Sequence, residues 1–413
     1  MASQRPAPRA ASTAPPPPPA AAPAPAWLPW ALLAATLAAW LIGVRGDLLR
    51  PSIYAQDTWL ADALLHGQLH LRHVPDVPAD LAFWQNRYFV VFGPFPAVLL
   101  MPLVAVRGLV TPDVLVLVIT ALAGVRGFYQ LVRTVVGEDT GLLACATLTF
   151  ALGTALAYGA PMGGVWLHTQ ITATTLQVFA LLAAARGRAW GCGVLLGLGV
   201  LTRPTVALAA PFAWWLLAQR MPAPRKGAPR PTPLWGLLTP VTASMLVLAL
   251  YNAMRFGDPL DGGYLKQMIS EPLAFRIREH GQFSLAFFPE NLFGTLLRPP
   301  LWQKGALVPD LRGMGLPLTT PFLLLTLWPG KRAPFEARAL ANCALIALPA
   351  LLYYNDGSMQ FGNRFALDWE VLGLLVATSA ARRAPRWLPW TLAAWGVVVG
   401  AWGLQWFRSA FQR

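Results

Sequence analysis

The chain has 413 residues, of which 56% are hydrophobic and only 12% are charged, and its formal net charge at pH 7 is +14. In soluble domains about a quarter of the residues are charged, so a soluble fold of this length would lack the polar side chains that cover its exterior. The composition therefore excludes a soluble globular enzyme and predicts an integral membrane protein.

Residues 1–25 consist almost entirely of Pro and Ala. This composition cannot form a packed core and predicts a disordered cytoplasmic tail. The apolar run that follows, from Trp27 to Val44, is longer than the core of a typical signal peptide and is predicted to be a retained first span. Residues 26–413 are then predicted to form one transmembrane domain.

The later apolar segments are predicted to cross the bilayer as helices, because in hydrocarbon only helices satisfy the backbone polar groups within one segment. They lie at 112–132, 140–160, 167–185, 189–201, 204–219, 234–251, 314–328, 337–354, 365–380 and 387–407. With the first span they predict an all-α, polytopic membrane protein with about eleven transmembrane helices. The run at 94–106 would be less than about 20 Å long as a helix and is predicted to lie at the membrane interface.

Charge orients these segments. If 94–106 stays at the interface and 189–201 crosses, the basic connectors all fall on one side of the membrane. The positive-inside rule assigns that side, and the N-terminus with it, to the cytoplasm. The connectors carry Arg133, Arg186, Arg188, Arg220, Arg225, Lys226, Arg230, Lys331, Arg332, Arg382, Arg383 and Arg386. Because the positive charge is spread over short connectors and not gathered in one domain, membrane lipids are predicted as partners and nucleic acid is not.

The opposite, non-cytoplasmic face then receives two substantial loops. The first outer loop, with surface helices, covers 46–111, and the second covers 252–313. Nearly all the acidic residues are predicted to lie on this face. Chemistry is therefore expected there.

Three aspartates of the first outer loop are candidates for a general base. Asp57 and Asp62 belong to a stretch with helical potential that ends at Gly67 and has one apolar side, as in a helix along a membrane surface. Asp80 follows it. A carboxylate held against apolar surroundings has a raised pKa and can take a proton from a hydroxyl group. The alternative for each aspartate is a helix cap or a solvated face.

Four cations are candidates for binding a phosphate group. Arg203 and Arg364 are predicted at the outer boundary of apolar runs, where an arginine is costly unless it snorkels or meets an anion. Lys266 and Arg298 belong to the second outer loop. Arg contacts phosphate through two parallel hydrogen bonds, so the pair of boundary arginines favours an anionic, lipid-linked substrate. The alternatives are ordinary snorkelling and interfacial anchoring, and Asp368 is positioned to pair with Arg364.

Candidate contacts to an acceptor or a sugar are His168, Gln170, Tyr264 and Tyr88. A lone histidine such as His168 is otherwise an ordinary interface residue. The sequence has no HExxH or DxD motif and no clustered Cys/His spacing, so no metal site is predicted, a divalent metal is not expected and no cofactor is implied. The cysteines fall in apolar segments and are predicted to be small core residues; they are Cys145, Cys192 and Cys343.

Several stretches resemble the GT-C superfamily of polytopic glycosyltransferases, in particular the bacterial branch related to protein O-mannosyltransferases and lipid A aminoarabinose transferases. They are LADALLHGQLHL with the following DLAFWQNRYFVVFGPFPAVLLMPLVAV, GVLLGLGVLTRPTVALAAP, FGDPLDGGYL, FSLAFFPENLFGTLLRPP and SMQFGNRFALDWEVLGLL. In order, they cover most of residues 54–375.

The resemblance implies transfer of a sugar from a polyprenyl-phosphate donor to a glycan, lipid or protein acceptor outside the cytoplasm, with inversion. An acidic residue of the first outer loop would be the base, and arginines would stabilise the departing lipid phosphate. In the family the acid stands at the start of the surface helix, a place that here falls near Ser52 and Ile53, which carry no carboxylate. Asp57 is the nearest replacement and the first choice, with Asp62 and Asp80 as alternatives. Asp57→Asn is expected to abolish transfer and leave membrane insertion intact.

Two rival functions come from other classes. A transporter or flippase of a lipid-linked glycan predicts polar residues that continue through the midplane of the membrane. A non-catalytic membrane scaffold or polymerase subunit predicts no turnover. An assay with purified protein and polyprenyl-phosphate sugars separates the three.

Overall fold

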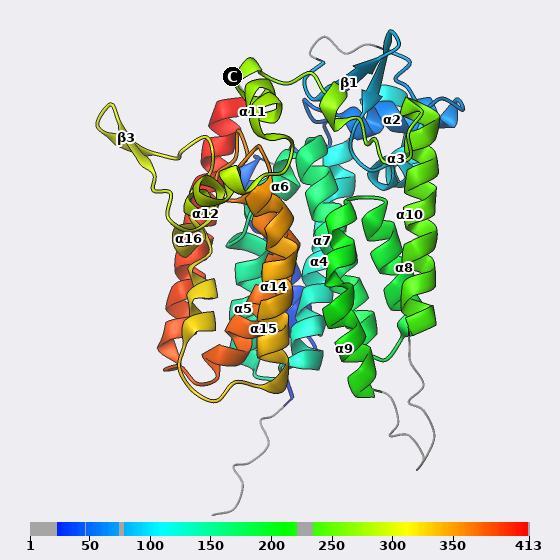
Figure 1. Cartoon of the computed structure of the whole chain (residues 1–413). Helices are drawn as coiled ribbons and strands as arrows, with labels where there is room; N and C mark the ends of the chain where they lie inside the picture. The colour runs from blue at the N-terminus through cyan, green and yellow to red at the C-terminus, as the bar shows by residue number, and fades with distance from the viewer. Residues whose placement is uncertain (1–22, 46, 74–77, 221–233, 412–413) are drawn as a thin grey trace, which may run out of the picture.

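The computed structural model describes residues 23–45, 47–73, 78–220 and 234–411. Most of the tail predicted to be disordered therefore lies outside the described residues, as do the basic residues Arg225, Lys226 and Arg230. The described chain is mostly helical, and its long helices run side by side in one bundle (Figure 1). Short helices and two hairpins gather at one end of that bundle, which we call the loop end.

The helices of the bundle, several of them short or of 3₁₀ type, coincide with the apolar segments predicted from the sequence. They are α1 (Leu28–Gly43), α4 (Asp113–Val135), α5 (Thr140–Leu152), α6 (Leu156–Met162), α7 (Val165–Ala185), α8 (Ala189–Val200), η2 (Pro204–Ala209), α9 (Ala210–Arg220), α10 (Leu234–Phe256), α13 (Leu316–Thr319), η5 (Pro321–Leu327), α14 (Pro334–Leu352), α15 (Leu367–Ala381) and α16 (Trp387–Phe411). Every apolar segment that was predicted to cross is thus helical over most of its length.

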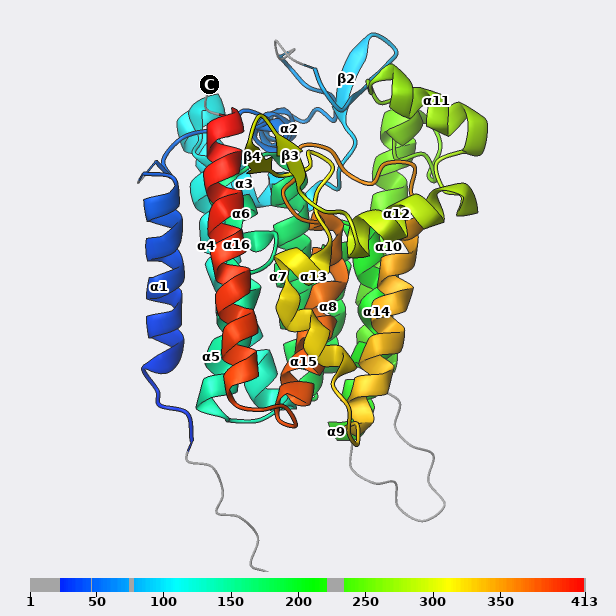
Figure 2. The same ribbon diagram turned by 90° about the vertical axis from the view of Figure 1, so that its left-hand side faces the viewer.

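The elements of the loop end come from the two predicted outer loops and the segments beside them. They are α2 (Gln56–Leu65), β1 (Leu81–Trp84), β2 (Arg87–Val90), α3 (Phe95–Arg107), η1 (Gly108–Val110), η3 (Tyr264–Lys266), α11 (Glu271–His280), η4 (Leu285–Phe287), α12 (Phe288–Leu296), β3 (Leu301–Gln303), β4 (Ala306–Val308) and η6 (Arg364–Ala366). Each strand pairs with its neighbour in an antiparallel hairpin, with Leu81 opposite Val90 in the first and Leu301 opposite Val308 in the second. Figure 2 shows α2, α11 and both hairpins at the same end of the bundle.

By length and composition, four helices of the described chain can cross a membrane: α4, α10, α14 and α16. The bent pair α5 and α6, with an angle of 49° between its parts, makes a fifth. The structure thus supports a helical membrane protein with four to five such spans. The count of about eleven crossings stays a prediction, because α1 and α8 are shorter apolar helices.

Close packing of the bundle depends on small residues where two helices touch. A Cβ atom on Gly193 of α8 would lie 2.3 Å from the carbonyl oxygen of Gly236 in α10. One on Gly400 of α16 would lie 1.9 Å from the carbonyl oxygen of Leu152 in α5. Helices that associate inside a membrane use such residues because the hydrophobic effect does not drive them together there.

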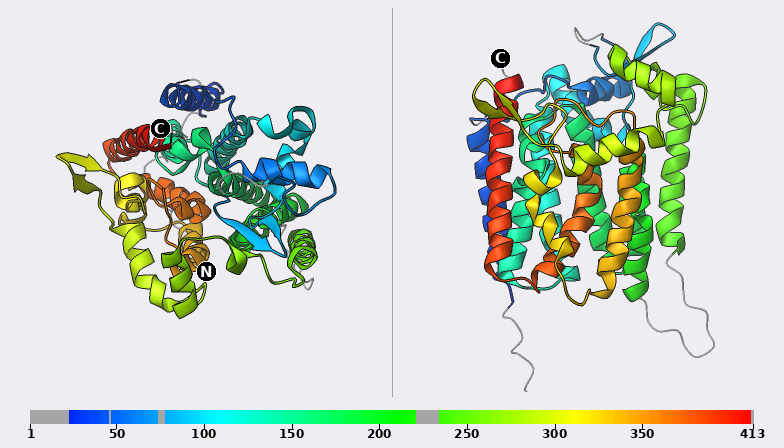
Figure 3. Two further views of the ribbon diagram at one scale, coloured as in Figure 1. Left: turned by 90° about the horizontal axis from the view of Figure 1, so that it is seen from above. Right: turned by 60° about the vertical axis from the view of Figure 1, so that its left-hand side comes forward.

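The basic connectors gather at the end of the bundle opposite to the loop end. The turn from α15 to α16 lies there in Figures 1 and 2, and Figure 3 shows the bundle from above and from a third side. At this end Arg383 forms an ion pair with the buried Glu336 of α14, at 2.8 Å. Asp139 caps the start of α5 by accepting a hydrogen bond from the backbone N–H of Leu142. The basic connectors that the structure describes thus lie at the end opposite to the two predicted outer loops.

Candidate functional site

A cavity of about 670 Å³ lies at the loop end of the bundle. Its walls come from many parts of the chain, among them the segment before α2, the loop before β1, the break between α6 and α7, the turn after α8, and the segments around η3 and around η6. Four of the predicted site residues line it, namely Asp80, Arg203, Tyr264 and Arg364. Residues that are far apart in the sequence thus share one chamber.

The first outer loop and the turn that carries Arg203 are in direct contact. The backbone N–H of Phe95, at the start of α3, donates to the carbonyl oxygen of Leu201, at 3.2 Å. A Cβ atom on Gly93 would lie 2.2 Å from the same oxygen, so only glycine allows this approach. The proposed base and the proposed phosphate ligands therefore belong to the same end of the molecule.

Asp80 is the carboxylate of the first outer loop that faces the cavity. Its backbone has a φ of 60°, in the left-handed region, where Asp is tolerated better than most residues. Hydrogen bonds from two directions fix this loop. The backbone N–H of Asp80 donates to the carbonyl of Met268, and the carbonyl of Asp80 accepts from the side chain of Gln267. On the other side, the side chain of Gln56 in α2 donates to the carbonyl of Ala79. Strained backbone that is fixed in this way is typical of functional sites.

The indole Nε1–H of Trp166 donates to Oδ2 of Asp80, at 3.0 Å. In the described part of the chain no donor reaches Oδ1, which leaves that oxygen for a ligand. Burial raises the pKa of Asp80, and the hydrogen bond from Trp166 and the positive charge of Arg364 partly offset the rise. A half-buried carboxylate with one free oxygen is suited to accept a proton.

Arg203 and Arg364 both lie near the aromatic ring of Phe365. Their guanidinium carbons lie 5.9 Å and 5.1 Å from the centre of its ring. Arg364 is almost fully buried, donates to the carbonyl of Ser358 and forms no ion pair among the described residues. Nε of Arg203 is buried without a hydrogen-bond partner. Two cations so arranged have capacity left for an anion.

Asp368 pairs with Arg203, not with Arg364 as the sequence suggested. Its Oδ2 lies 3.0 Å from Nη2 of Arg203 and accepts from the hydroxyl of Thr205 at 3.4 Å. Its Oδ1 accepts from the side-chain amide of Gln170. Gln170 itself does not line the cavity, so its predicted contact with a substrate is replaced by an orienting contact with Asp368.

Aromatic side chains cover the wall around Asp80. The rings of Tyr54 and Trp166 lie 4.7 Å apart, and those of Phe283, Tyr353 and Tyr354 form a second group with separations of 5.3 and 4.5 Å. Tyr264 lies in the cavity wall as predicted, and its burial raises the pKa of the phenol. Flat aromatic faces beside hydrogen-bonding groups can bind the apolar face of a sugar ring.

Asp57, the first choice for the base, does not line the cavity. It is buried in α2, and its Oδ2 lies 2.9 Å from Nδ1 of His168 in α7, with the two side chains 3% and 2% exposed. Burial raises the pKa of Asp57, and the contact with His168 opposes the rise. The pair joins α2 to α7, and neither side chain lines the cavity that holds Asp80.

Asp62 and Tyr88 also lie outside the cavity. Asp62 forms an ion pair with Arg72, at 3.0 Å, and stays on the side of α2 near His66. Tyr88 belongs to β2 and packs against Phe83 across the hairpin, with the two rings tilted and their centres 4.9 Å apart. The prediction that they contact substrate finds no support in their position.

Lys266 and Arg298 have partners of their own. Lys266 pairs with Asp261 and lies over the ring of Trp84, at 4.5 Å. Arg298 donates to Asp356 at 2.6 Å and to the carbonyl of Arg312. Neither lines the cavity, so the structure does not bring these two predicted phosphate ligands together with Arg203 and Arg364.

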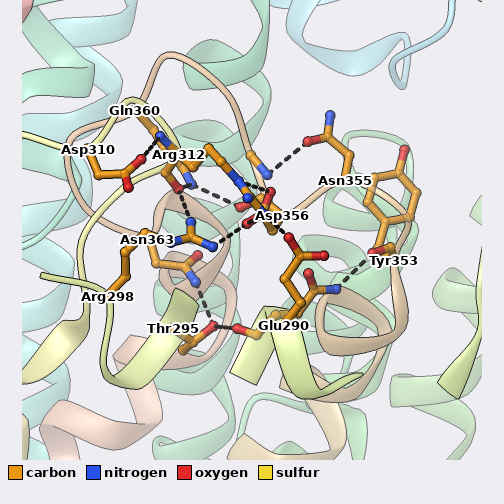
Figure 4. Close-up of polar contacts among 12 residues, drawn as sticks. Glu290, Thr295, Arg298, Asp310, Arg312, Tyr353, Asn355, Asp356, Gln360 and Asn363 are labelled. Atoms are coloured by element: carbon orange, nitrogen blue, oxygen red, sulfur yellow. Dashed lines mark hydrogen bonds and ion pairs between the residues drawn. The ribbon is translucent and has the colours of Figure 1, made fainter. Parts of the chain in front are cut away.

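The network around Asp356 supports the segment that carries Arg364. Figure 4 shows Arg298 and Arg312 converging on Asp356, with Glu290 beside Arg312. The side chain of Gln360 donates to the carbonyls of Arg312 and Asp356, and its Oε1 accepts from the backbone N–H of Arg364. A chain of polar contacts thus runs from the second outer loop to the cavity wall.

Trp166 and Arg50 line the cavity but were not among the predicted site residues. Trp166 carries no signal of its own in a chain that has 18 tryptophans. Arg50 follows Asp47 in a stretch that reads as an ordinary connector. Among the described residues, no group of His, Cys, Asp and Glu side chains is placed to hold a metal ion.

No protein-family model and no curated protein matches the chain. Solved structures similar to it include ArnT from Cupriavidus metallidurans in the apo state, with a TM-score of 0.49 and 14% identity over 86% of this chain and 60% of that one. They also include two structures of the Archaeoglobus fulgidus oligosaccharyltransferase. One, tethered to an acceptor peptide, has a TM-score of 0.45 and 13% identity over 93% of this chain and 55% of that one.

The other, the oligosaccharyltransferase AglB in complex with an inhibitory peptide and a dolichol-phosphate, has a TM-score of 0.45 and 15% identity over 94% of this chain and 56% of that one. The chain spans about three fifths or less of the length of these structures. At these TM-scores the likeness carries no argument about function, which rests on the geometry of the site.

Proposed function

We propose that the chain is a membrane glycosyltransferase that moves a sugar from a polyprenyl-phosphate donor to a hydroxyl group of an acceptor at the loop end of the bundle. One observation carries the proposal: Asp80, Arg203 and Arg364 line a single cavity. A free carboxylate oxygen and two arginines with unused capacity for an anion are the groups that such a transfer needs.

Asp80 takes the part of the general base. Its Oδ1 accepts the proton of the acceptor hydroxyl while Trp166 holds Oδ2 in place. The acceptor oxygen then forms a bond to the anomeric carbon, and the bond from that carbon to the phosphate oxygen breaks with its electron pair leaving on the phosphate. Attack from the side opposite to the leaving group inverts the anomeric centre.

Arg203 and Arg364 stabilise the phosphate as it gains negative charge. Donors fixed before the reaction stabilise developing charge without reorganising, and their effect is largest where water is excluded. Arg364 is 9% exposed, and Arg203 is held by Asp368 at 3.0 Å. The apolar bundle below the cavity supplies a membrane surface through which a lipid chain reaches the site.

Orientation completes the proposal. The positive-inside rule applied to the basic connectors places the opposite, loop end on the periplasmic or extracellular side of a bacterial inner membrane, with the N-terminus in the cytoplasm. The acceptor is then a glycan, lipid or protein outside the cytoplasm. About eleven crossings fit this orientation.

The test uses purified full-length protein in lipid nanodiscs with a panel of radiolabelled polyprenyl-phosphate sugars. Wild type is expected to transfer label to an envelope acceptor extract, and Asp80→Asn is expected to lose the transfer. Asp62→Asn is the matched control, because it removes a carboxylate of the same loop outside the cavity. Loss of activity in Asp62→Asn with full activity in Asp80→Asn would overturn the assignment of the base.

A transporter or flippase is the second candidate, and one observation favours it. Buried polar side chains continue along α7 into the bundle, as Thr172, Thr174, Thr175 and Gln177. The cavity reaches Thr169 but none of these deeper residues. Movement of a fluorescent lipid-linked sugar between leaflets, without any glycosylated product, would support this function and contradict the transferase.

A further inference from the structure

Arg50 is a third arginine that lines the cavity. It belongs to the segment before α2, whereas Arg203 and Arg364 come from the turn after α8 and from η6. Arg50 lines the cavity together with Ser52, Tyr54 and the Gly163–Gly164 break before α7. The proposed reaction assigns no task to it. Its surroundings show whether it is a solvated side chain or part of a built site.

The segment that carries Arg50 is fixed at two nearby points. The backbone N–H and the hydroxyl of Ser52 both donate to Asp113, at 2.7 and 2.5 Å, so that each oxygen of this carboxylate is used. Two residues later, the carbonyl of Tyr54 accepts from the backbone N–H of Val165, at 3.0 Å. Arg50 is therefore held beside the first turn of α7.

The guanidinium group of Arg50 has donors to spare. Its Nε and Nη2 atoms are buried and have no hydrogen-bond partner among the described residues. Its one ion pair joins Nε to Asp47 at 3.3 Å, and the Asp47 side chain is 55% exposed. A pair with such an exposed partner contributes little, whereas a buried N–H without a partner is costly. An anion in the cavity would relieve that cost.

The start of α7 adds to the positive potential at this wall. Helix α7 has 21 residues, and Gly163, Gly164 and Trp166 at its beginning line the cavity. The N-terminus of a helix carries a partial positive charge that favours anions. The helix end and the arginine reinforce each other, since the two features face the same chamber.

We propose that Arg50 and the N-terminus of α7 form a second phosphate-binding subsite, distinct from the one at Arg203 and Arg364. The ligand is a phosphate group that enters the cavity together with the first. It belongs either to the donor, which would then be diphosphate-linked, or to an anionic acceptor. The inference rests on the proposed function for the first subsite, but it is tested by binding and not by turnover.

The experiment measures the dissociation constants of three probes: farnesyl phosphate, farnesyl diphosphate and inorganic phosphate. Inorganic phosphate is added after farnesyl phosphate has saturated the subsite at Arg203 and Arg364. Wild type, Arg50→Gln and Arg50→Lys are compared in nanodiscs. Arg107→Gln is the control, because Arg107 is exposed at the end of α3 and lies outside the cavity. Loss of one charge-assisted contact is expected to weaken phosphate binding by about tenfold.

The arms distinguish the two sources. If the second phosphate belongs to the donor, Arg50→Gln weakens farnesyl diphosphate binding and leaves farnesyl phosphate unchanged. If it belongs to an acceptor, both lipids bind as in wild type and inorganic phosphate binding is lost. Arg50→Lys is expected to retain part of the affinity, because it keeps the charge.

Two results would overturn the subsite. One is unchanged binding of all three probes in Arg50→Gln. The other is equal weakening of all three, in both Arg50 variants, which would mean that Arg50 only supports the fold. Failure of the proposed function is a separate result, namely that wild type binds farnesyl phosphate but transfers no sugar.

Discussion

Trp166 donates a hydrogen bond of 3.0 Å from its indole nitrogen to Oδ2 of Asp80, across 86 positions of the sequence. The contact joins the start of α7 to the first outer loop. It also lowers the pKa of Asp80 against the larger effect of burial, which raises it. Trp166 is therefore placed to tune the proposed base without touching the reacting atoms.

Trp166→Phe is expected to shift the acidic limb of the pH profile of kcat/KM to higher pH. A general base works only when deprotonated, so activity falls as the pH drops through its pKa. The hydrogen bond from Trp166 lowers the pKa of Asp80. Without it the pKa rises, so the acidic limb of the profile moves to higher pH. An unchanged limb with reduced kcat would mean that Asp80 is not the group that titrates.

Arg364→Gln is expected to lower kcat by about 100-fold, the usual loss when one fixed donor to a developing charge is removed. Arg364→Lys should restore part of the rate, because it keeps the charge but loses the second parallel hydrogen bond. Steady-state kinetics with the labelled donor measure both. Arg278→Gln is the control, since Arg278 is exposed on α11 and pairs with Glu271. Full activity of Arg364→Gln would remove this arginine from the site.

Substitution of Asp57 distinguishes a structural role of this residue from a role as the catalytic base. Its contact with His168 is buried on both sides, and removal of one partner of a buried pair costs about 3–5 kcal/mol. Asp57→Asn is therefore expected to lower the thermal unfolding temperature, and Asp57→Asn with His168→Asn should recover part of the loss. The prediction fails if Asp57→Asn unfolds like wild type but has no transferase activity, which is the behaviour of a catalytic base.

The helices could be predicted from the sequence because apolar runs of fixed length have one structural solution in a membrane. Arg203 and Arg364 could be singled out for a related reason: an arginine beside such a run is unusual, and both line the cavity. The network that holds Arg298 could not be foreseen. Its partner Asp356 lies 58 residues further along, and no local pattern links the two.

The choice among the aspartates depended on tertiary contacts. Asp57 and Asp80 both lie in the first outer loop, and local sequence favours Asp57 because it lies at the start of a surface helix. The fold brings the buried side chain of Asp57 to His168 of α7, a histidine 111 positions away. Asp80 instead lines the cavity, and the isolated β-bridge between Ala82 and Gln267 ties its loop to the second outer loop. Neither pairing has a local signature.

Labelling of single cysteines tests the sidedness on which the proposal depends. Asn86→Cys lies in the turn between β1 and β2, and Arg386→Cys lies in the turn before α16; both positions are exposed and at opposite ends of the bundle. Background labelling should be low, because the native cysteines are all buried in the bundle: Cys145, Cys192 and Cys343.

A membrane-impermeant maleimide is expected to label Asn86→Cys in intact cells and Arg386→Cys only after permeabilisation. The reason is that Arg386 lies at the end of the bundle whose connectors are rich in arginine and lysine, and such connectors stay in the cytoplasm. Asp310→Cys, exchanging a residue of the second outer loop, should behave as Asn86→Cys does. Labelling of Asn86→Cys and Arg386→Cys under the same condition would place both ends of the bundle in one compartment, and a lipid-linked donor could then not reach the cavity from the membrane as proposed.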